Sequence, residues 1–234
     1  MNPVLVRQHV ASAPPGLLAG WLDARGLAYE VSRSWLGDAL PDPERYAFVA
    51  SLGHDRMAGD IDDPAVTAEH ELLGRAVALD VPVLGLCYGG QVLAAQFGAD
   101  VGPAPVAELG WHAIETDDAG LVPTGPWLEW HFERFETPPC ATELARTAHA
   151  AQAFRLGPHL GVQFHPEATV EIVEGWARAD AAQLAARGIA DAGALLAASP
   201  EQRAAAKVAA FRLFDAFLAL AQVGPDQSEQ RLAH

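Results

Sequence analysis

One cysteine of this chain, Cys87, lies in a sequence context that can make a nucleophile. It follows an apolar run at residues 81–86 and stands in the middle of a Gly-x-Cys-x-Gly turn at residues 85–89. A helix predicted over residues 90–97 begins directly after the turn. A sharp turn from a strand into a helix presents its middle side chain to a substrate, and the free N–H groups of the helix start favour a thiolate over a thiol. A buried, inert cysteine is the alternative for Cys87 taken alone, but the order of strand, turn and helix favours the nucleophile, with the amide of Tyr88 aimed at an oxyanion.

A histidine and a glutamate further along the chain could supply the base that a cysteine nucleophile needs. A strand predicted over residues 160–164 leads directly into His165, and Pro166 favours an extended backbone at His165. Residues two apart in an extended segment point the same way, so Glu167 can lie beside His165. Glu167 would then orient one ring nitrogen while the other faces the thiolate. A histidine that only ends a strand is the alternative for His165 alone; its place downstream of the cysteine turn favours the base.

Together, the two segments resemble the class I glutamine amidotransferases, which are hydrolases with a Cys-His-Glu triad. The match to the Gly-x-Cys-x-Gly-x-Gln string at residues 85–91 and to the Phe-His-Pro-Glu string at residues 164–167 is complete. The resemblance covers residues 3 to about 175 and implies a flavodoxin-like three-layer α/β/α sandwich, with a mainly parallel central sheet and an antiparallel extension. The triad that it implies is Cys87 as nucleophile, His165 as base and Glu167 as the residue that orients the base.

The same resemblance implies an oxyanion hole and a substrate contact. The family takes one oxyanion donor from a Gly-Gly-Pro loop after the third strand, and the matching stretch here is Ser-Leu-Gly-His at residues 51–54. Gly53 therefore fills the position of the second glycine, and His54 stands where the family has proline. We expect the amides of Gly53 and Tyr88 to form the oxyanion hole, and Gln91 to help hold the γ-glutamyl group.

A closer resemblance is to stand-alone, GMP-synthase-like amidotransferases. These carry an acidic-Leu/Ile-Gly-Trp segment, here residues 108–111, and a Trp-His-x-Asp segment, here residues 130–133 with Glu in place of Asp. In that group the histidine lies near the substrate end of the cleft, so His131 is a candidate for substrate binding. A packing histidine in an aromatic-rich loop is the alternative.

The elements that must position these residues alternate along the first half of the chain. Strands are predicted at residues 3–10, 28–34, 46–52 and 81–86, and helices at residues 15–25, 64–79 and 90–97. This alternation is typical of a parallel sheet with both faces covered. Closely spaced strands at residues 111–116, 143–148, 151–156 and 160–164 predict the antiparallel extension. Helices follow over residues 170–223, and the apolar face of the last one either covers the core, which we favour, or joins two copies in a homo-oligomer.

Composition limits the remaining classes of protein. The 234 residues include 30 acidic and 15 basic side chains, a formal net charge of −15, and 50% are hydrophobic. We expect one folded domain over residues 1–223 and a flexible tail over residues 224–234. The acidic excess argues against binding to nucleic acid. The chain shows no signal-peptide pattern and no apolar run near the roughly 20 residues that span a bilayer, so we expect a cytoplasmic protein that does not bind membranes.

Neither a metal nor another cofactor is expected. The two cysteines have no zinc-like spacing and no His-x-x-x-His pair occurs, so no metal site is predicted. The glycines around Cys87 lack the Gly-Lys-Ser/Thr of a phosphate-binding loop.

The expected reaction is therefore hydrolysis of the γ-amide of glutamine, or of a γ-glutamyl compound, through a thioester on Cys87. The predicted hydrolase fold takes up nearly all of the chain, so any synthetase that uses the ammonia is expected to be a separate partner subunit. Without such a partner, the enzyme would act as a γ-glutamyl peptidase. The alternatives are a non-catalytic binding module, and an enzyme of the DJ-1/PfpI group, which shares the cysteine turn but lacks the His-Pro-Glu string.

Overall fold

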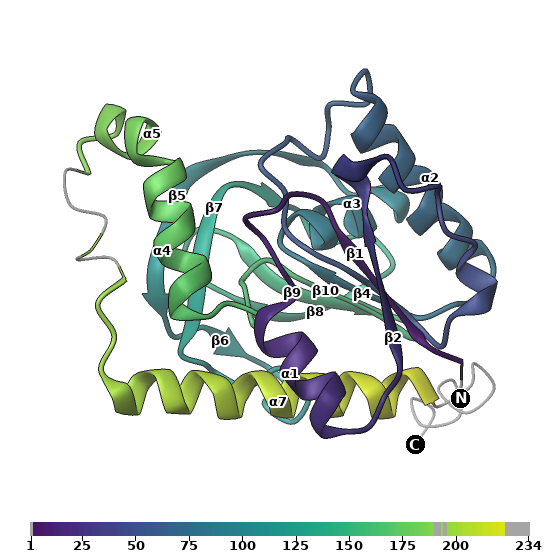
Figure 1. Cartoon of the computed structure of the whole chain (residues 1–234). Coiled ribbons are helices and arrows are strands. Elements are labelled where there is room, and N and C mark those ends of the chain that lie inside the picture. The colour runs from purple at the N-terminus through teal and green to yellow at the C-terminus, as the bar shows by residue number, and fades with distance from the viewer. Residues whose placement is uncertain (1, 190–192, 194–195, 223–234) are drawn as a thin grey trace.

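The centre of the protein is an eight-stranded sheet, seen in a computed structural model that describes residues 2–189, 193 and 196–222 (Figure 1). The strand order is β2-β1-β3-β4-β10-β9-β8-β6. Five neighbouring strands are parallel: β2 (Tyr29–Arg33), β1 (Val4–Gln8), β3 (Val49–Ser51), β4 (Val83–Leu86) and β10 (His159–Val162). Three antiparallel strands extend the sheet beyond β10: β9 (Ala151–Leu156), β8 (Thr142–Arg146) and β6 (Glu115–Thr116). The expected mainly parallel sheet with an antiparallel extension is confirmed.

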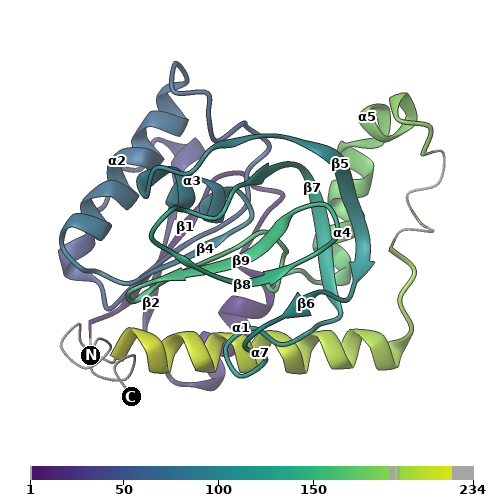
Figure 2. The ribbon, with the colours of Figure 1, turned by 180° about the vertical axis from the view of Figure 1, so that it is seen from behind.

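Helices cover both faces of this sheet (Figures 1 and 2). On one face, α1 (Gly16–Ala24) and α7 (Pro200–Gln222) pack on strand residues such as Val4 and Val6. On the other face, α2 (Pro64–Ala78) and α3 (Tyr88–Gln96) pack on Leu5 and its neighbours. Successive residues of β1 thus point to opposite faces, as the period of a strand requires. The three-layer α/β/α sandwich is confirmed.

The start of α2 follows from its acidic residues. Asp63 is the N-cap, its side chain accepts a hydrogen bond from the Ala65 amide at 2.8 Å, and Pro64 occupies the first helical position. Two short 3-10 helices, Ser34–Leu36 and Pro43–Arg45, lie in the connection between β2 and β3.

A second sheet of two strands was not anticipated from the sequence. The antiparallel strands β5 (Val101–His112) and β7 (Trp127–Phe135) pair over most of their length. Two prolines make residues 101–110 look like a loop, and the register shift between Pro103 and Glu108 shows how the strand accommodates them. The single strand predicted at residues 111–116 is wrong, because β5 ends at His112 and β6 begins at Glu115.

The chain after the sheet is helical, as predicted. The helices α4 (Val170–Ala179) and α5 (Ala181–Ala186) precede α7, and Thr169 caps α4 by accepting from the Ile172 amide at 3.4 Å. In α7, Leu213, Phe214 and Phe217 are buried in the core, in agreement with a role in covering the sheet. Val208 does not belong to this face, since it is 61% exposed. Residues 223–234, which include the expected tail, lie outside the described residues, and the single domain over residues 1–223 stays a prediction.

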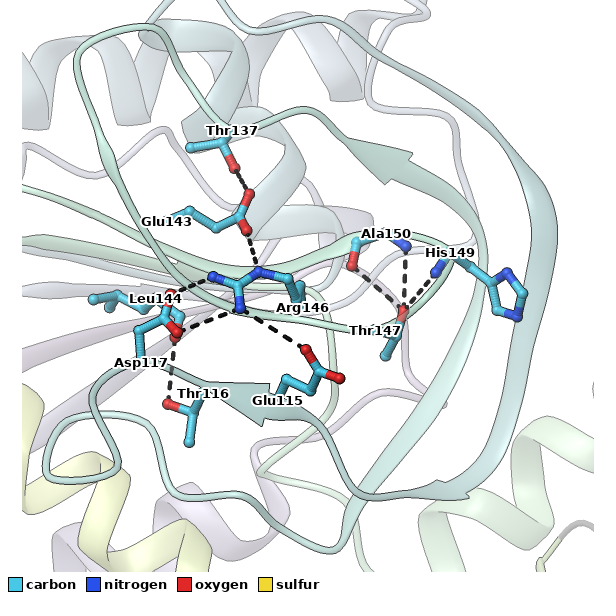
Figure 3. Close-up of polar contacts among 10 residues, drawn as sticks. All are labelled: Glu115, Thr116, Asp117, Thr137, Glu143, Leu144, Arg146, Thr147, His149 and Ala150. Carbon is cyan, nitrogen blue, oxygen red and sulfur yellow. Dashed lines mark hydrogen bonds and ion pairs between the residues drawn. The ribbon is translucent and has the colours of Figure 1, made fainter.

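Arg146 of β8 ties the antiparallel end of the sheet together (Figure 3). Its Nε donates to Glu143 Oε1 at 2.8 Å, and its guanidinium also pairs with Asp117 beyond β6. The Arg146 side chain is 36% exposed, so these pairs fix the geometry of the extension more than they contribute to stability.

Over the described ranges, no helix has the length and apolar character needed to cross a membrane. Within the same ranges, no group of three or more His, Cys, Asp or Glu side chains is arranged to hold a metal ion.

His159 makes the stability of the core depend on pH. The side chain is buried in β10 beside the Phe97 ring, and burial lowers its pKa from 6.5 to about 4, although the charge of Asp80 opposes the shift. Below pH 6.5 the unfolded chain binds a proton that the folded chain excludes. His159 therefore does not lower the free energy of unfolding above pH 6.5, and it lowers this free energy progressively as the pH falls towards 4. Each pH unit in this window costs up to about 1.4 kcal/mol.

We therefore expect His159→Leu to flatten the fall in the free energy of unfolding between pH 6.5 and pH 4.5, measured by urea denaturation. His149→Leu, at an exposed histidine, is the matched control and should leave the slope of the wild type. Equal slopes for His159→Leu and the wild type would contradict this account of the buried imidazole.

Candidate active site

Cys87 lies at the turn between β4 and α3 with a strained backbone. Its φ is 50° and its ψ is −107°, a backbone conformation that residues other than glycine rarely adopt. The strain is held in place by backbone bonds on both sides: the Cys87 amide donates to Val162 O at 2.9 Å, and Cys87 O accepts from the Gln91 amide at 2.9 Å. The helix begins at Tyr88, two residues earlier than predicted. The geometry is that of a turn that presents a nucleophile.

The glycines of the turn are required by close contacts with neighbouring backbone. A Cβ on Gly89 would lie 2.3 Å from the carbonyl oxygen of Ser51, and a Cβ on Gly85 would lie 2.5 Å from that of Gly89. These contacts press the start of α3 against the end of β3. The turn therefore lies beside the loop that follows β3, where a second oxyanion donor was expected.

His165 lies beside Glu167, as their spacing predicts. Nδ1 of His165 is 2.8 Å from Glu167 Oε1, and both side chains are buried. The His165 amide donates to Leu128 O at 2.9 Å, and the Trp176 ring packs on the imidazole with 4.5 Å between ring centroids. Burial lowers the pKa of His165, but the charges and hydrogen bonds of Cys87 and Glu167 outweigh it and raise that pKa well above 6.5. The site therefore favours a protonated imidazole between the side chains of Cys87 and Glu167.

The two expected oxyanion donors flank the same space. A Cβ on Gly53 would lie 3.0 Å from His165 Cε1, so the backbone of Gly53 packs directly against the imidazole. Tyr88 is the first residue of α3, and an amide at that position has no acceptor within the helix. The structure thus brings Gly53 and Tyr88 together with the three residues predicted to form the triad.

A buried polar network lies next to the loop that follows β3, and the sequence did not predict it. Ser51 Oγ donates to Glu69 Oε1 at 2.6 Å, and Arg7 Nε donates to Glu69 Oε2 at 3.1 Å. Nε2 of His9 lies 3.2 Å from Ser51 Oγ. All four side chains are buried, and Ser51 is two residues before Gly53. The network therefore fixes the end of β3, from which the Gly53 amide projects.

His54 takes the place of the proline that the resemblance leads one to expect. Its ring stacks flat on His9, with 5.3 Å between centroids and 7° between planes, and meets the edge of Tyr88 at 5.0 Å. Burial lowers the pKa of both His9 and His54, so the stack consists of neutral rings. The packing of the His54 ring thus restrains the loop after β3. A proline at this position would restrain the same loop through its fixed φ.

Gln91 is buried below the turn and is linked to Cys87 through a second glutamine. Gln91 Nε2 donates to Gln163 Oε1 at 3.4 Å, and Gln163 Nε2 donates to Cys87 Sγ at 3.7 Å. Gln163 was not anticipated: it is the first residue after β10, which ends at Val162, and nothing in its local sequence indicates a contact with Cys87.

His131 is brought into the site by the unexpected pairing of β5 with β7. The register places Glu108 opposite His131, so the two segments of the closer resemblance lie side by side. Nε2 of His131 is 3.2 Å from Glu129 Oε2 and 3.5 Å from Glu108 Oε2, and Nδ1 is 2.8 Å from Glu133 O. Burial lowers the pKa of His131, but the two glutamates outweigh it and raise the pKa to about 10. Both ring nitrogens face protein groups, so His131 serves as the cation of a buried cluster that has two carboxylates.

The cleft above Cys87 has two lobes. The large lobe, of about 360 Å³, is lined by residues that include Tyr88, Gln91, Trp130, His131, Phe132 and Arg187. The small lobe, of about 110 Å³, is lined by residues that include Ala13, Gly53, Trp130, His165, Trp176 and Asp180. Cys87 borders both lobes, so both lie within reach of its side chain.

Comparisons with known proteins find relatives that are similar in sequence and in fold. A family model described as glutamine amidotransferase class-I matches residues 57–173, half of the chain. A GMP synthase (glutamine-hydrolyzing) of Aeropyrum pernix is 34% identical over 155 residues, which are 60% of this chain and 28% of the relative. One subunit of a GMP synthase (glutamine-hydrolyzing) of Ignicoccus hospitalis is 40% identical over 95 residues, 37% of this chain and 50% of the relative. The chain thus spans half or less of the length of these two relatives.

A solved structure is similar over nearly the whole chain. The crystal structure of a glutamine amido transferase from Methylobacillus flagellatus has a TM-score of 0.82 and 28% identity, and the match covers 95% of this chain and 96% of that one.

Proposed function

The chain belongs to the class I glutamine amidotransferase family, and we propose that it hydrolyses the γ-amide of glutamine, or of a γ-glutamyl compound, through a γ-glutamyl thioester on Cys87. One observation carries the proposal. The His165 imidazole, held by Glu167 at 2.8 Å, borders the same cleft as the strained Cys87 and has a pKa that its interactions with Cys87 and Glu167 raise. Nucleophile, base and orienting acid are the set that acyl transfer requires.

In the acylation step, the Cys87 thiolate attacks the γ-carbonyl carbon and a bond forms between Sγ and that carbon. The carbonyl electrons move onto oxygen, and the amides of Gly53 and Tyr88 stabilise the oxyanion. As the oxyanion collapses, the bond from carbon to nitrogen breaks and His165 gives its proton to the leaving nitrogen. The products are ammonia or an amine and the γ-glutamyl thioester.

In the deacylation step, neutral His165 takes a proton from water while the water oxygen attacks the thioester carbon. The bond from carbon to sulfur then breaks, which releases glutamate and restores the pair of Cys87 thiolate and imidazolium. Glu167 remains charged and keeps Nδ1 of His165 oriented throughout.

The glutamyl part of the substrate is proposed to lie in the large lobe. Gln91 borders this lobe and can contact the γ-glutamyl group. His131 borders the same lobe, and Glu108 and Glu129 each have an oxygen within 3.5 Å of its Nε2. The carboxyl oxygens that His131 holds in place can attract the α-ammonium of the substrate, which is the part that we assign to His131 in substrate binding.

The direct test is release of glutamate by the purified chain alone from glutamine and from a γ-glutamyl anilide. We expect turnover of at least one of the two. No glutamate from either substrate would contradict the proposed hydrolysis and would favour a non-catalytic binding module.

A second candidate is transfer of the ammonia to a separate synthetase subunit. It is supported by the Ignicoccus hospitalis relative, whose name makes it one subunit of a GMP synthase. A γ-glutamyl peptidase and an amidotransferase subunit differ in the preferred substrate of the isolated chain. The peptidase cleaves γ-glutamyl conjugates at full rate without any partner.

A further inference from the structure

The small lobe of the cleft lies on the side of Cys87 from which the leaving nitrogen must depart. His165 borders the small lobe, whereas Gln91 and His131 border only the large lobe. If His165 protonates the leaving nitrogen, as the proposed function on which this step rests requires, the amine half of the substrate points into the small lobe. The glutamyl half then occupies the large lobe.

The small lobe is too large for ammonia alone. Its volume is about 110 Å³, whereas a molecule the size of water needs roughly 10–15 Å³ of such space. Several carbon atoms attached to the leaving nitrogen can therefore enter without displacing protein atoms.

The walls of the small lobe are mainly apolar. Two tryptophans border it, and the polar atom of each is already bonded: Trp176 Nε1 donates to Ser12 O at 2.9 Å, and Trp130 Nε1 donates to Asp180 Oδ2 at 2.7 Å. Ala13 and Ala179 add small apolar surfaces. The lobe thus offers contact area to hydrocarbon between its polar side chains, which include Asp55 and Asp180.

The two lobes share two acids but differ in their cations. Asp55 and Asp180 border both lobes, and the one cation at neutral pH among the described residues that line the small lobe, His165, already faces Cys87 and Glu167. Arg56 and Arg187 border only the large lobe. A carboxylate on the leaving amine, as in a γ-glutamyl amino acid, would therefore lie beside two acids without a cation of its own.

We propose that the small lobe is a binding subsite for the leaving amine, and that it selects γ-glutamyl amides of short, uncharged alkylamines over γ-glutamyl amino acids.

Three substrates test this selection with the purified chain: glutamine, γ-glutamyl isobutylamide and γ-glutamylglycine. The isobutyl and glycyl groups have the same arrangement of heavy atoms and differ in charge. We expect kcat/KM for the isobutylamide to exceed that for γ-glutamylglycine by roughly tenfold or more. Equal values, or a preference for γ-glutamylglycine, would overturn the subsite. Turnover of glutamine without turnover of the isobutylamide would also overturn it and leave the proposed function standing, whereas no turnover of any substrate would refute the proposed function itself.

Two variants test the assignment of the lobe. Ala179 is an exposed residue of α4 that borders the small lobe, and Ala179→Leu should fill it and lower the ratio of isobutylamide to glutamine kcat/KM by roughly tenfold. Ala186→Leu, at an exposed alanine of α5 that borders neither lobe, is the matched control and should leave the ratio unchanged. A ratio that Ala179→Leu does not change would overturn the assignment.

Asp180→Asn tests the role of charge and keeps an oxygen that can accept from Trp130. The ratio of γ-glutamylglycine to isobutylamide kcat/KM should rise several-fold, because one of the two acids near the substrate carboxylate is neutralised. A ratio that stays at the wild-type value would show that the acids do not select the leaving amine.

Discussion

Replacing Cys87 with alanine is expected to lower kcat for glutamate release by roughly 10⁴-fold or more, because the variant has no atom that can form the thioester. The turn itself should persist, since its backbone is held by bonds to Val162 and from Gln91 that do not involve the thiol. The variant should therefore still bind glutamine. The measurement is steady-state glutamate release, with calorimetric titration of glutamine to show that binding is retained.

The second cysteine provides the control for this substitution. Cys140 is free and exposed, and it borders neither lobe of the cleft. Cys140→Ala should keep the activity of the wild type. Glutaminase or γ-glutamyl hydrolase activity that survives in Cys87→Ala would refute the assignment of Cys87 as nucleophile.

Replacing His165 with alanine is expected to have an effect of similar size, again roughly 10⁴-fold or more in kcat, because both proton transfers are lost. It should also change the nucleophile directly. The raised pKa of His165 favours a positive charge beside Cys87, and alanine removes that charge. Alkylation of Cys87 by iodoacetamide at pH 6, which needs neither the oxyanion hole nor the substrate lobes, should therefore become slower.

A histidine outside the site separates this effect from a general change in reactivity. His112 lies in β5, and its Nε2 is 2.9 Å from Leu109 O. His112→Ala should leave the alkylation rate at pH 6 unchanged. If His165→Ala lowered turnover but left the alkylation rate of the wild type, the imidazolium would not be the group that stabilises the thiolate.

The parts of the site that could be predicted from the sequence are those set by neighbouring residues. The Gly-x-Cys-x-Gly turn is local, because the close contact of Gly85 with Gly89 follows from a strand that runs directly into a helix. The pair of His165 and Glu167 is also local, because a turn closed by the bond from the Ala168 amide to His165 O brings the two residues together. Alternating strands and helices likewise predicted the parallel part of the sheet.

The parts that could not be predicted depend on residues far apart in the chain. The pairing of Glu108 with His131 needs a strand that contains two prolines, which local pattern excludes. The network of Arg7, Ser51 and Glu69 joins two strands and a helix, and none of these residues has an unusual neighbourhood in the sequence. Trp176 packs on His165 only because α4 folds back over the cleft.

The central claim is that the γ-glutamyl group is carried on Cys87, and mass spectrometry after an acid quench tests it most directly. The wild-type chain is mixed with glutamine, stopped in acid during turnover and digested. We predict that the peptide containing Cys87 gains the mass of one glutamyl group, and that the Cys87→Ala chain shows no such adduct. Steady release of glutamate with no adduct on Cys87, or with an adduct on another residue, would contradict the account.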